Sequence, residues 1–338
     1  MRITPTWIHN FETRLNTLID GSSERITRNL FWDKVMDLKE SVTGKELFFW
    51  LIESAKLYRE GQGGNKRYDD LAATYFEIVN EDIGAGLVLT KNEIQDNMMA
   101  APELRGMPAL DYAASWARQM GALAARWPQD VMFDLLAAGE TATGYDGVAF
   151  FSTSHPVDPF NAGAGTYANL LTSSASGDYP GACPIDSTNA AQLDTAANNF
   201  AKAVAYVQGL KGPNGKPRNL TVKYAMAGVG LRKRLHEILD TKYLGVSNIE
   251  NVISRYGIEP IIASELSASD TSYYLICEFM PGEGGPLVFQ KREDFVLSSY
   301  APYNEVELQR RKEFEWTYDG RSAGSYGHPY MIFKVKAS

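Results

Sequence analysis

The stretch that decides the fold is PALDYAASWARQMGALAARWPQDVMFDLLAAGE, residues 108–140. Its apolar residues recur at alternating steps of three and four, which places them on one stripe of a helix. They are Leu110, Ala113, Ala117, Met120, Ala124 and Trp127. Three of the six are alanine, so another element can approach this stripe closely. At about 1.5 Å per residue the helix would be roughly 45 Å long. Pro128 predicts either a kink or the start of a second helix.

The aromatic turn GYDGVAFFSTSHP follows at residues 144–156. It gathers four groups that occur in hydrolase sites, namely Asp146, Ser152, Ser154 and His155. The G-x-S-x-G spacing of a nucleophile elbow is absent, and no oxyanion-hole motif accompanies them. We therefore expect His155, which precedes a proline, to fix a turn. A soluble hydrolase that uses His155 with Asp146 or Ser152 is the alternative from another functional class.

Length and composition set the class of protein. The 338 residues allow two domains, and 44% hydrophobic with 22% charged residues is typical of a soluble globular chain. The longest apolar run, LFFWLI at 47–52, is too short to cross a bilayer, which needs about 20 residues. The amino-terminal sequence lacks the pattern of a secretory signal, so we expect the protein to act inside a cell.

Charge and residue spacing argue against several kinds of site. The net charge of −8, from 33 basic and 41 acidic residues, disfavours a protein that grips nucleic acid, although one that only encloses DNA is allowed. Cys183 and Cys277 form neither a disulfide framework nor a zinc site. His9, His236 and His328 show no metal-ligand spacing. We predict no catalytic, cofactor-binding or metal site.

The amino-terminal half contains two segments that need a packing partner. Residues 1–44 carry apolar residues at loose helical intervals, which predicts either an arm that lies on a neighbouring molecule or a first helix packed on its own core. Residues 45–92 read as a long two-stranded excursion with a Gly-rich tip at 61–70. The tip lacks the GK[ST] ending of a phosphate loop. An isolated two-stranded ribbon is marginal in water, so we expect it to lie on a neighbour.

The carboxyl-terminal half predicts a compact α/β domain and a return to strand. Residues 157–186, rich in small and polar residues, are expected to form a surface loop. Two amphipathic helices are predicted at 188–210 and 230–243, and strands at 220–225, 259–264, 272–279 and 286–290. The basic run Arg232, Lys233, Arg234 is placed on the polar side of the second helix, as a solvated or intersubunit salt-bridge face.

The final strands show the clearest alternation. Phe314, Trp316 and Tyr318 alternate with Glu313, Glu315 and Thr317, which predicts one packed and one wet face. The Gly-rich stretch at 320–329 is expected to turn the chain into a closing strand at 330–337.

Several of these motifs resemble one known family. The segments at 75–97 (YFEIVNEDIGAGLVLTKNEIQDN), 144–156 and 219–239 are similar to the Mu-like bacteriophage major head subunits, which are major capsid proteins of the Hong Kong 97 fold. The closing segment at 314–338 is also similar. The resemblance covers nearly the whole chain in the expected order.

The resemblance implies an α+β fold with four parts. They are an N-terminal arm at 1–44, an extended β-hairpin loop at 45–92, a peripheral domain with a long spine helix at 93–186 and 299–338, and an α/β axial domain at 187–298. It implies no enzyme activity and no cofactor. The insert at 161–184 is longer than the family pattern suggests.

The resemblance also implies how the protein works. Copies of the chain would form hexamers and pentamers of an icosahedral phage head that encloses double-stranded DNA without sequence-specific binding. Contacts between these assemblies would run through 1–44 and 45–92. A separate scaffold protein, a portal and a decoration protein are expected partners, with assembly in the bacterial cytoplasm and a final location in the virion. An encapsulin-like protein compartment is the alternative within the same fold.

Overall fold

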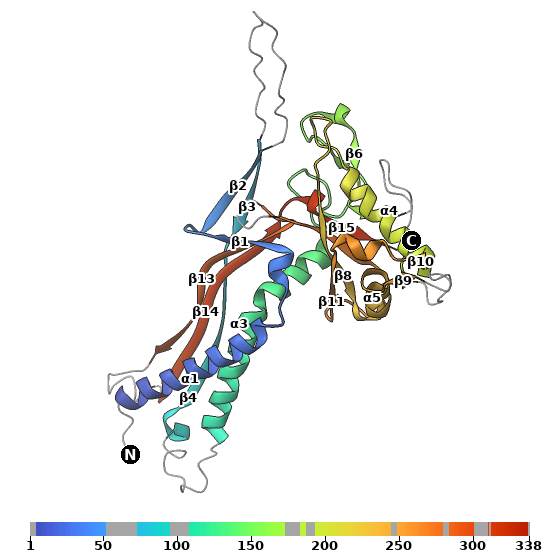
Figure 1. Cartoon of the computed structure of the whole chain (residues 1–338). Helices are drawn as coiled ribbons and strands as arrows, with labels where there is room; N and C mark the ends of the chain where they lie inside the picture. The colour runs from blue at the N-terminus through green and yellow to red at the C-terminus, as the bar shows by residue number, and fades with distance from the viewer. Residues whose placement is uncertain are drawn as a thin grey trace, which may run out of the picture.

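The computed structural model describes residues 5–51, 73–94, 108–172, 183–186, 193–244, 249–279, 284–300, 310 and 312–336. Two larger sheets dominate this part of the chain, and one long helix connects them (Figure 1). A four-stranded sheet runs along the helix, and a five-stranded sheet lies at its carboxyl end.

Helix α3 (Pro108–Ala138) is the predicted spine. It runs through Pro128 as a single helix of 31 residues, so no second helix begins there. The predicted apolar stripe is confirmed where side chains are described: Ala113 and Ala117 are fully buried, and Met120, Ala124 and Trp127 are partly buried. The side chain of Leu110 lies outside the described residues.

Helix α1 (Pro5–Thr27) packs against α3 of its own chain (Figure 1). Its buried face consists of Ile8, Phe11, Leu15 and Ile19. The Ser22 hydroxyl donates a hydrogen bond of 2.7 Å to the Arg118 carbonyl of α3. Of the two predictions for the amino terminus, the first helix on its own core is therefore correct for residues 5–27, and the arm with few internal contacts is wrong there.

The four-stranded sheet has the strand order β1-β13-β14-β4. The strands are β1 (Met36–Glu40), β13 (Leu287–Tyr300), β14 (Glu313–Tyr326) and β4 (Glu81–Thr90). The two longest, β13 and β14, pair antiparallel, β4 pairs antiparallel with β14, and β1 runs parallel to β13.

Strand β14 confirms one prediction and corrects another. Phe314, Trp316 and Tyr318 are buried against helices α1 and α3, as their alternation predicted. The expected turn at 320–329 is wrong, because β14 continues to Tyr326 and the chain turns only after it. At Gly324 a Cβ would lie 2.2 Å from the Val131 Cγ1 atom of α3. The glycine there serves the close approach of helix and strand.

The five-stranded sheet has the order β11-β8-β12-β15-β7 and is buried on both faces. Helices α4 (Leu193–Gly209) and α5 (Arg232–Leu239) cover one face. Both predicted helices are confirmed, but the second is shorter than predicted, because it ends at Leu239 and Tyr243 lies in a strand. The strands are β11 (Glu259–Ala263), β8 (Val222–Gly228), β12 (Tyr273–Cys277), β15 (Ile332–Val335) and β7 (Leu170–Leu171).

The other face of this sheet meets the end of the spine. Tyr274 and Ile276 of β12 pack in one cluster with Met132 and Leu136 of α3. Glu140, just beyond the helix, accepts hydrogen bonds of 2.7 Å from Lys334 Nζ and 2.6 Å from Lys336 Nζ. Burial alone would raise the pKa of Glu140, but these two lysines outweigh it and lower the pKa.

The short elements complete the chain. They are the hairpin strands β2 (Lys45–Leu51) and β3 (Ala73–Val79), the pairs β5 (His155–Pro156) with β6 (Thr166–Tyr167) and β9 (Tyr243–Leu244) with β10 (Ile249–Glu250), and the single turns η1 (Trp32–Lys34), η3 (Ala162–Ala164), η5 (Val229–Leu231), η6 (Ile253–Tyr256) and η7 (Pro329–Met331).

Three segments lie elsewhere than the sequence suggested. The predicted loop at 157–186 is not on the surface throughout, because Tyr167, Leu171, Cys183 and Ile185 belong to the core under α4. Strand β15, expected beside the spine, joins the five-stranded sheet, whereas β13 begins in the range assigned to the axial domain and pairs within the four-stranded sheet. The four predicted domain boundaries remain a prediction.

Candidate assembly surfaces and the buried histidine turn

The aromatic turn is built around two buried phenylalanines. Phe150 stacks on Tyr326 with ring centroids 4.5 Å apart, and Phe151 contacts Tyr274 at 5.9 Å. Both rings are almost fully buried between the spine and the two sheets. Each pair joins the turn to a different sheet, so the turn connects the two halves of the molecule.

His155 lies in the same buried region with both ring nitrogens bonded. Its Nδ1 atom is 2.6 Å from Asp146 Oδ2, and its Nε2 atom is 3.0 Å from Asn169 Oδ1 and 3.1 Å from the Phe150 carbonyl. The His155 and Asp146 side chains are 0% and 2% exposed. Asn169 also donates 2.7 Å to the Phe150 carbonyl and 3.0 Å to the Pro329 carbonyl. Sequence analysis missed Asn169, since a lone asparagine in a polar stretch gives no signal.

This geometry favours a structural role for His155 over a catalytic one. A general base needs a ring nitrogen within reach of the proton that it accepts. Both nitrogens of His155 are within hydrogen-bond distance of oxygens of the protein itself. Ser152 Oγ instead accepts a hydrogen bond of 3.1 Å from the Ser154 amide.

His9 and His236 lie at the surface, whereas the ring of His328 contacts that of Tyr145 in the aromatic turn, with centroids 6.4 Å apart. His9 is exposed on α1, and His236 pairs with Asp240 at 2.6 Å on the surface of α5. His328 packs on Tyr330 with centroids 4.8 Å apart. Across the described ranges, no three His, Cys, Asp or Glu side chains are placed to hold a metal ion. No helix in those ranges is long and apolar enough to cross a membrane.

His328 should make the protein sensitive to acid. Burial lowers the pKa of His328 to about 4, with a smaller contribution from Arg218. In the unfolded chain this histidine is protonated near pH 6.5, whereas in the folded protein it stays neutral down to about pH 4. The free energy of unfolding is therefore highest above pH 6.5 and falls by roughly 3 kcal/mol as the pH decreases toward 4. In His328→Gln, the free energy of unfolding measured in urea should fall less between pH 7 and pH 4.5. The exposed His9→Gln variant should keep the wild-type slope; equal slopes in all three proteins would contradict the assignment.

The basic run on α5 differs from its prediction at one residue. Lys233 is exposed as expected. Arg234 is buried, and its NH1 atom lies 3.1 Å from Glu237. The placement of Arg234 on the polar face is therefore wrong.

Cys183 and Cys277 are buried free thiols, and burial raises the pKa of the Cys277 thiol to about 12.

The hairpin β2–β3 projects away from both sheets (Figure 1). In the described ranges its strands pair only with each other, from Lys45 with Val79 to Leu51 with Ala73. Apolar side chains are exposed at its base, where Val42 is 78% and Val79 is 58% exposed. The Gly-rich tip lies outside the described residues.

A second candidate surface is at the end of the five-stranded sheet. There Tyr243, Val252 and Tyr256 are exposed around the short strands β9 and β10.

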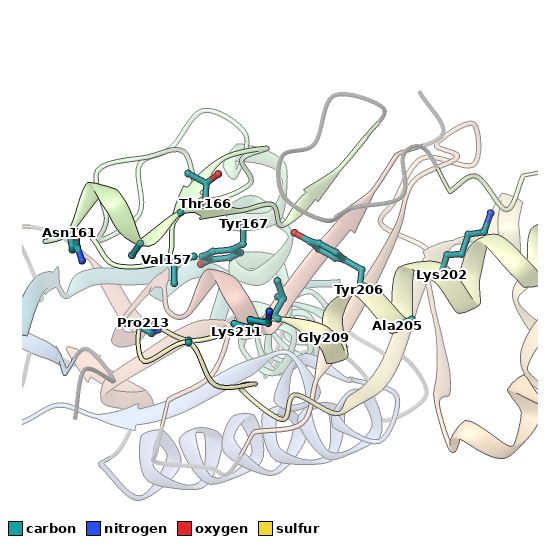
Figure 2. Close-up of a pocket in the computed structure, with 15 residues that line it drawn as sticks. Val157, Asn161, Thr166, Tyr167, Lys202, Ala205, Tyr206, Gly209, Lys211 and Pro213 are labelled. Atoms are coloured by element: carbon teal, nitrogen blue, oxygen red, sulfur yellow. The ribbon is translucent and has the colours of Figure 1, made fainter. Parts of the chain in front are cut away.

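A pocket of about 680 Å³ lies between residues 157–167 and α4 with the loop after it (Figure 2). Tyr206 of α4 points toward Tyr167 and exchanges hydrogen bonds with the backbone of Ala168. This contact attaches the insert to the helix.

Comparison with known proteins supports the interpretation as a shell protein. The sequence matches the family described as Mu-like prophage major head subunit gpT over residues 10–180 and 259–338. A comparison with curated protein sequences finds no match.

Solved structures show the same fold. The mature capsid of bacteriophage PhiM1 gives a TM-score of 0.52 at 9% identity, covering 91% of this chain and 87% of that chain. A virus-like particle from Pyrococcus furiosus gives 0.50 at 9% identity, covering 96% and 98%. The chain spans 64% of the length of a bacteriophage JBD30 capsid chain, with a TM-score of 0.47 at 13% identity over 90% of this chain. The PhiM1 and Pyrococcus furiosus matches confirm the predicted α+β fold of the Hong Kong 97 type.

Proposed function

This chain belongs to the family of Mu-like prophage major head subunits, and on that premise we propose that it is the major capsid protein of an icosahedral phage head. Copies associate into hexamers and pentamers, which close into a shell around double-stranded DNA. Contacts that repeat around a ring and close on themselves suit such assemblies. Many weak interfaces acting together then stabilise the shell.

The observation that carries the proposal is the projecting hairpin β2–β3. Its described strands have no third strand beside them, and two-stranded ribbons are marginal in water. The exposed Val42 and Val79 at its base add apolar surface that a neighbouring copy can cover. The predicted excursion at 45–92 is too long, because residues 81–90 form β4 in this chain's own four-stranded sheet. We infer that the hairpin β2–β3 lies on an adjacent subunit. Residues 5–27, which are packed on their own spine, contribute a smaller share of contacts between subunits than this hairpin.

The other partners follow from the same role. A separate scaffold protein would guide assembly in the bacterial cytoplasm, a portal would occupy one vertex, and a decoration protein could bind outside. The net charge of −8 suits a shell that encloses DNA without gripping its sequence. An encapsulin-like compartment would be built from the same fold. The contents of purified native particles distinguish the two functions: DNA protected from nuclease supports the phage head, and protein cargo supports the compartment.

Trimming the hairpin tip tests the proposal directly. Replacing residues 58–70 with a short Gly-Ser turn should lower the yield of shells at least about tenfold, because a contact repeated in every subunit is lost. The monomer should keep its thermal midpoint within about 2 °C, since the trimmed sequence consists mainly of glycine and charged residues, which seldom contribute to a core. Electron microscopy and sedimentation measure the shells, with the exposed Lys233→Ser variant as control. Normal shells from the trimmed protein would contradict the role of the hairpin.

A further inference from the structure

The base of the hairpin is crossed by two chain segments. Residues 41–44 lead from β1 into β2, and Asn80 leads from β3 into β4. A ribbon held by two connections can swing about them unless side chains fix its angle. Polar contacts concentrate at this point of the described chain.

Glu46 fixes the incoming connection. Its Oε1 atom accepts hydrogen bonds from the amides of Val42 at 3.0 Å and Thr43 at 3.1 Å. The hydroxyls of Thr43, at 3.0 Å, and Ser41, at 3.2 Å, donate to the same oxygen. The Val42 amide, followed by the Thr43 hydroxyl, lowers the pKa of Glu46, so the group is a carboxylate at neutral pH.

Asn80 joins both connections to the sheet. Its amide nitrogen Nδ2 donates to Ser41 Oγ and to the Thr43 carbonyl, each at 3.0 Å. Its backbone amide donates 3.1 Å to the Gly44 carbonyl. Its Oδ1 atom accepts a hydrogen bond of 2.8 Å from Gln290 Nε2, on β13.

Gln290 anchors this network in the core. It is fully buried in the middle of the four-stranded sheet, and its Nε2 atom also contacts the Ile78 carbonyl of β3 at 3.4 Å. Arg292, two residues along β13, donates 3.3 Å to the Ser41 carbonyl. One strand of the sheet thus holds both sides of the hairpin base.

We propose that Glu46, Asn80 and Gln290 form a latch that sets the angle between hairpin and sheet, and so position the hairpin for contact with a second copy of this chain. The inference rests on the proposed shell function. Asn80 donates through Nδ2 to the Ser41 hydroxyl and the Thr43 carbonyl and accepts through Oδ1 from Gln290, and two donor hydrogens beside a separate acceptor oxygen are the property of a side-chain amide. An aspartate would place a carboxylate against the Thr43 carbonyl and beside Glu46.

Pulsed electron spin resonance on the unassembled chain tests the latch. Spin labels at Glu77→Cys, on the hairpin, and Leu123→Cys, on the spine, report the angle as a distance. We expect one narrow distance distribution in the otherwise unchanged protein. Asn80→Ala should widen it about twofold, because several hydrogen bonds that select one angle are removed. Glu46→Gln, a change of similar size at a half-buried position, should widen it less.

Controls keep the two proposals separate. Asn214→Ala removes an asparagine from the turn that follows α4, away from the hairpin. Its Oδ1 atom accepts a hydrogen bond of 2.9 Å from the Lys216 amide. This variant should leave the spin-label distance distribution unchanged. If Asn80→Ala and Glu46→Gln both keep the wild-type width of the distance distribution, the proposed latch is wrong, whatever the protein assembles into. Failure of the unmodified chain to build shells would overturn the proposed function and leave the distance result standing. Where shells form, Asn80→Ala should give a broader range of particle diameters.

Discussion

Replacing Gly121 with leucine should lower the free energy of unfolding by about 3 kcal/mol or more. A Cβ at this position would lie 2.2 Å from the Ile19 carbonyl oxygen and 2.9 Å from the Ile19 Cα atom. These are backbone atoms of α1, so the conflict is relieved only when the two helices separate. Separation exposes Phe11 and Leu15, which the contact now buries. Urea unfolding followed by tryptophan fluorescence measures the effect, since Trp116 and Trp316 report on the same cluster.

Gly21 provides the matched control for this substitution. It lies in α1, and a Cβ there would meet nothing within 4 Å. Gly21→Leu should therefore be neutral or stabilise by up to about 1 kcal/mol through helix propensity. If Gly121→Leu proved as stable as the wild type, α1 would not be held on its own spine, and the interpretation of the amino terminus as an arm would be restored.

Replacing Asp146 with alanine should have a comparable effect, a loss of about 3–5 kcal/mol. The substitution leaves His155 buried without the carboxylate that now lies 2.6 Å from its Nδ1 atom. His155→Ala should cost about as much, because it strands the Asp146 carboxylate and opens a cavity beside Tyr167. Thermal and urea unfolding measure both variants, and shell yield should fall with stability.

The pair His236 and Asp240 is the control, because it has the same Nδ1 to Oδ2 distance of 2.6 Å at the surface. His236→Ala should cost less than about 1 kcal/mol, as exposed ion pairs contribute little. Ser152→Ala should leave shell yield near that of the wild type. A stable His155→Ala protein that had lost a hydrolytic activity would instead support the enzyme alternative.

Much of the molecule could be predicted because local patterns report local burial. Steps of three and four along 108–138 could belong only to a helix with one apolar face. Alternation at Phe314, Trp316 and Tyr318 specified a strand with one packed side. The lack of a nucleophile elbow around Ser152 predicted a structural histidine turn, and the protein oxygens beside both ring nitrogens of His155 support that prediction. Its partner Asn169 could not be found, because only the fold brings residues 146, 155 and 169 together.

The sequence by itself determined which faces of α3, α4 and β14 are buried, since the spacing of apolar residues follows directly from helix and strand geometry. Only the tertiary structure decided what covers those faces. The pattern of α1 was equally compatible with a neighbour and with its own spine, and the close approach at Gly121 settled it. The glycines at 320–327 predicted a turn, but in the structure Gly324 allows Val131 of α3 to pack closely against β14. The spacing of apolar residues along the chain shows that a face must be buried. Only the long-range contacts of the folded chain show which element buries it.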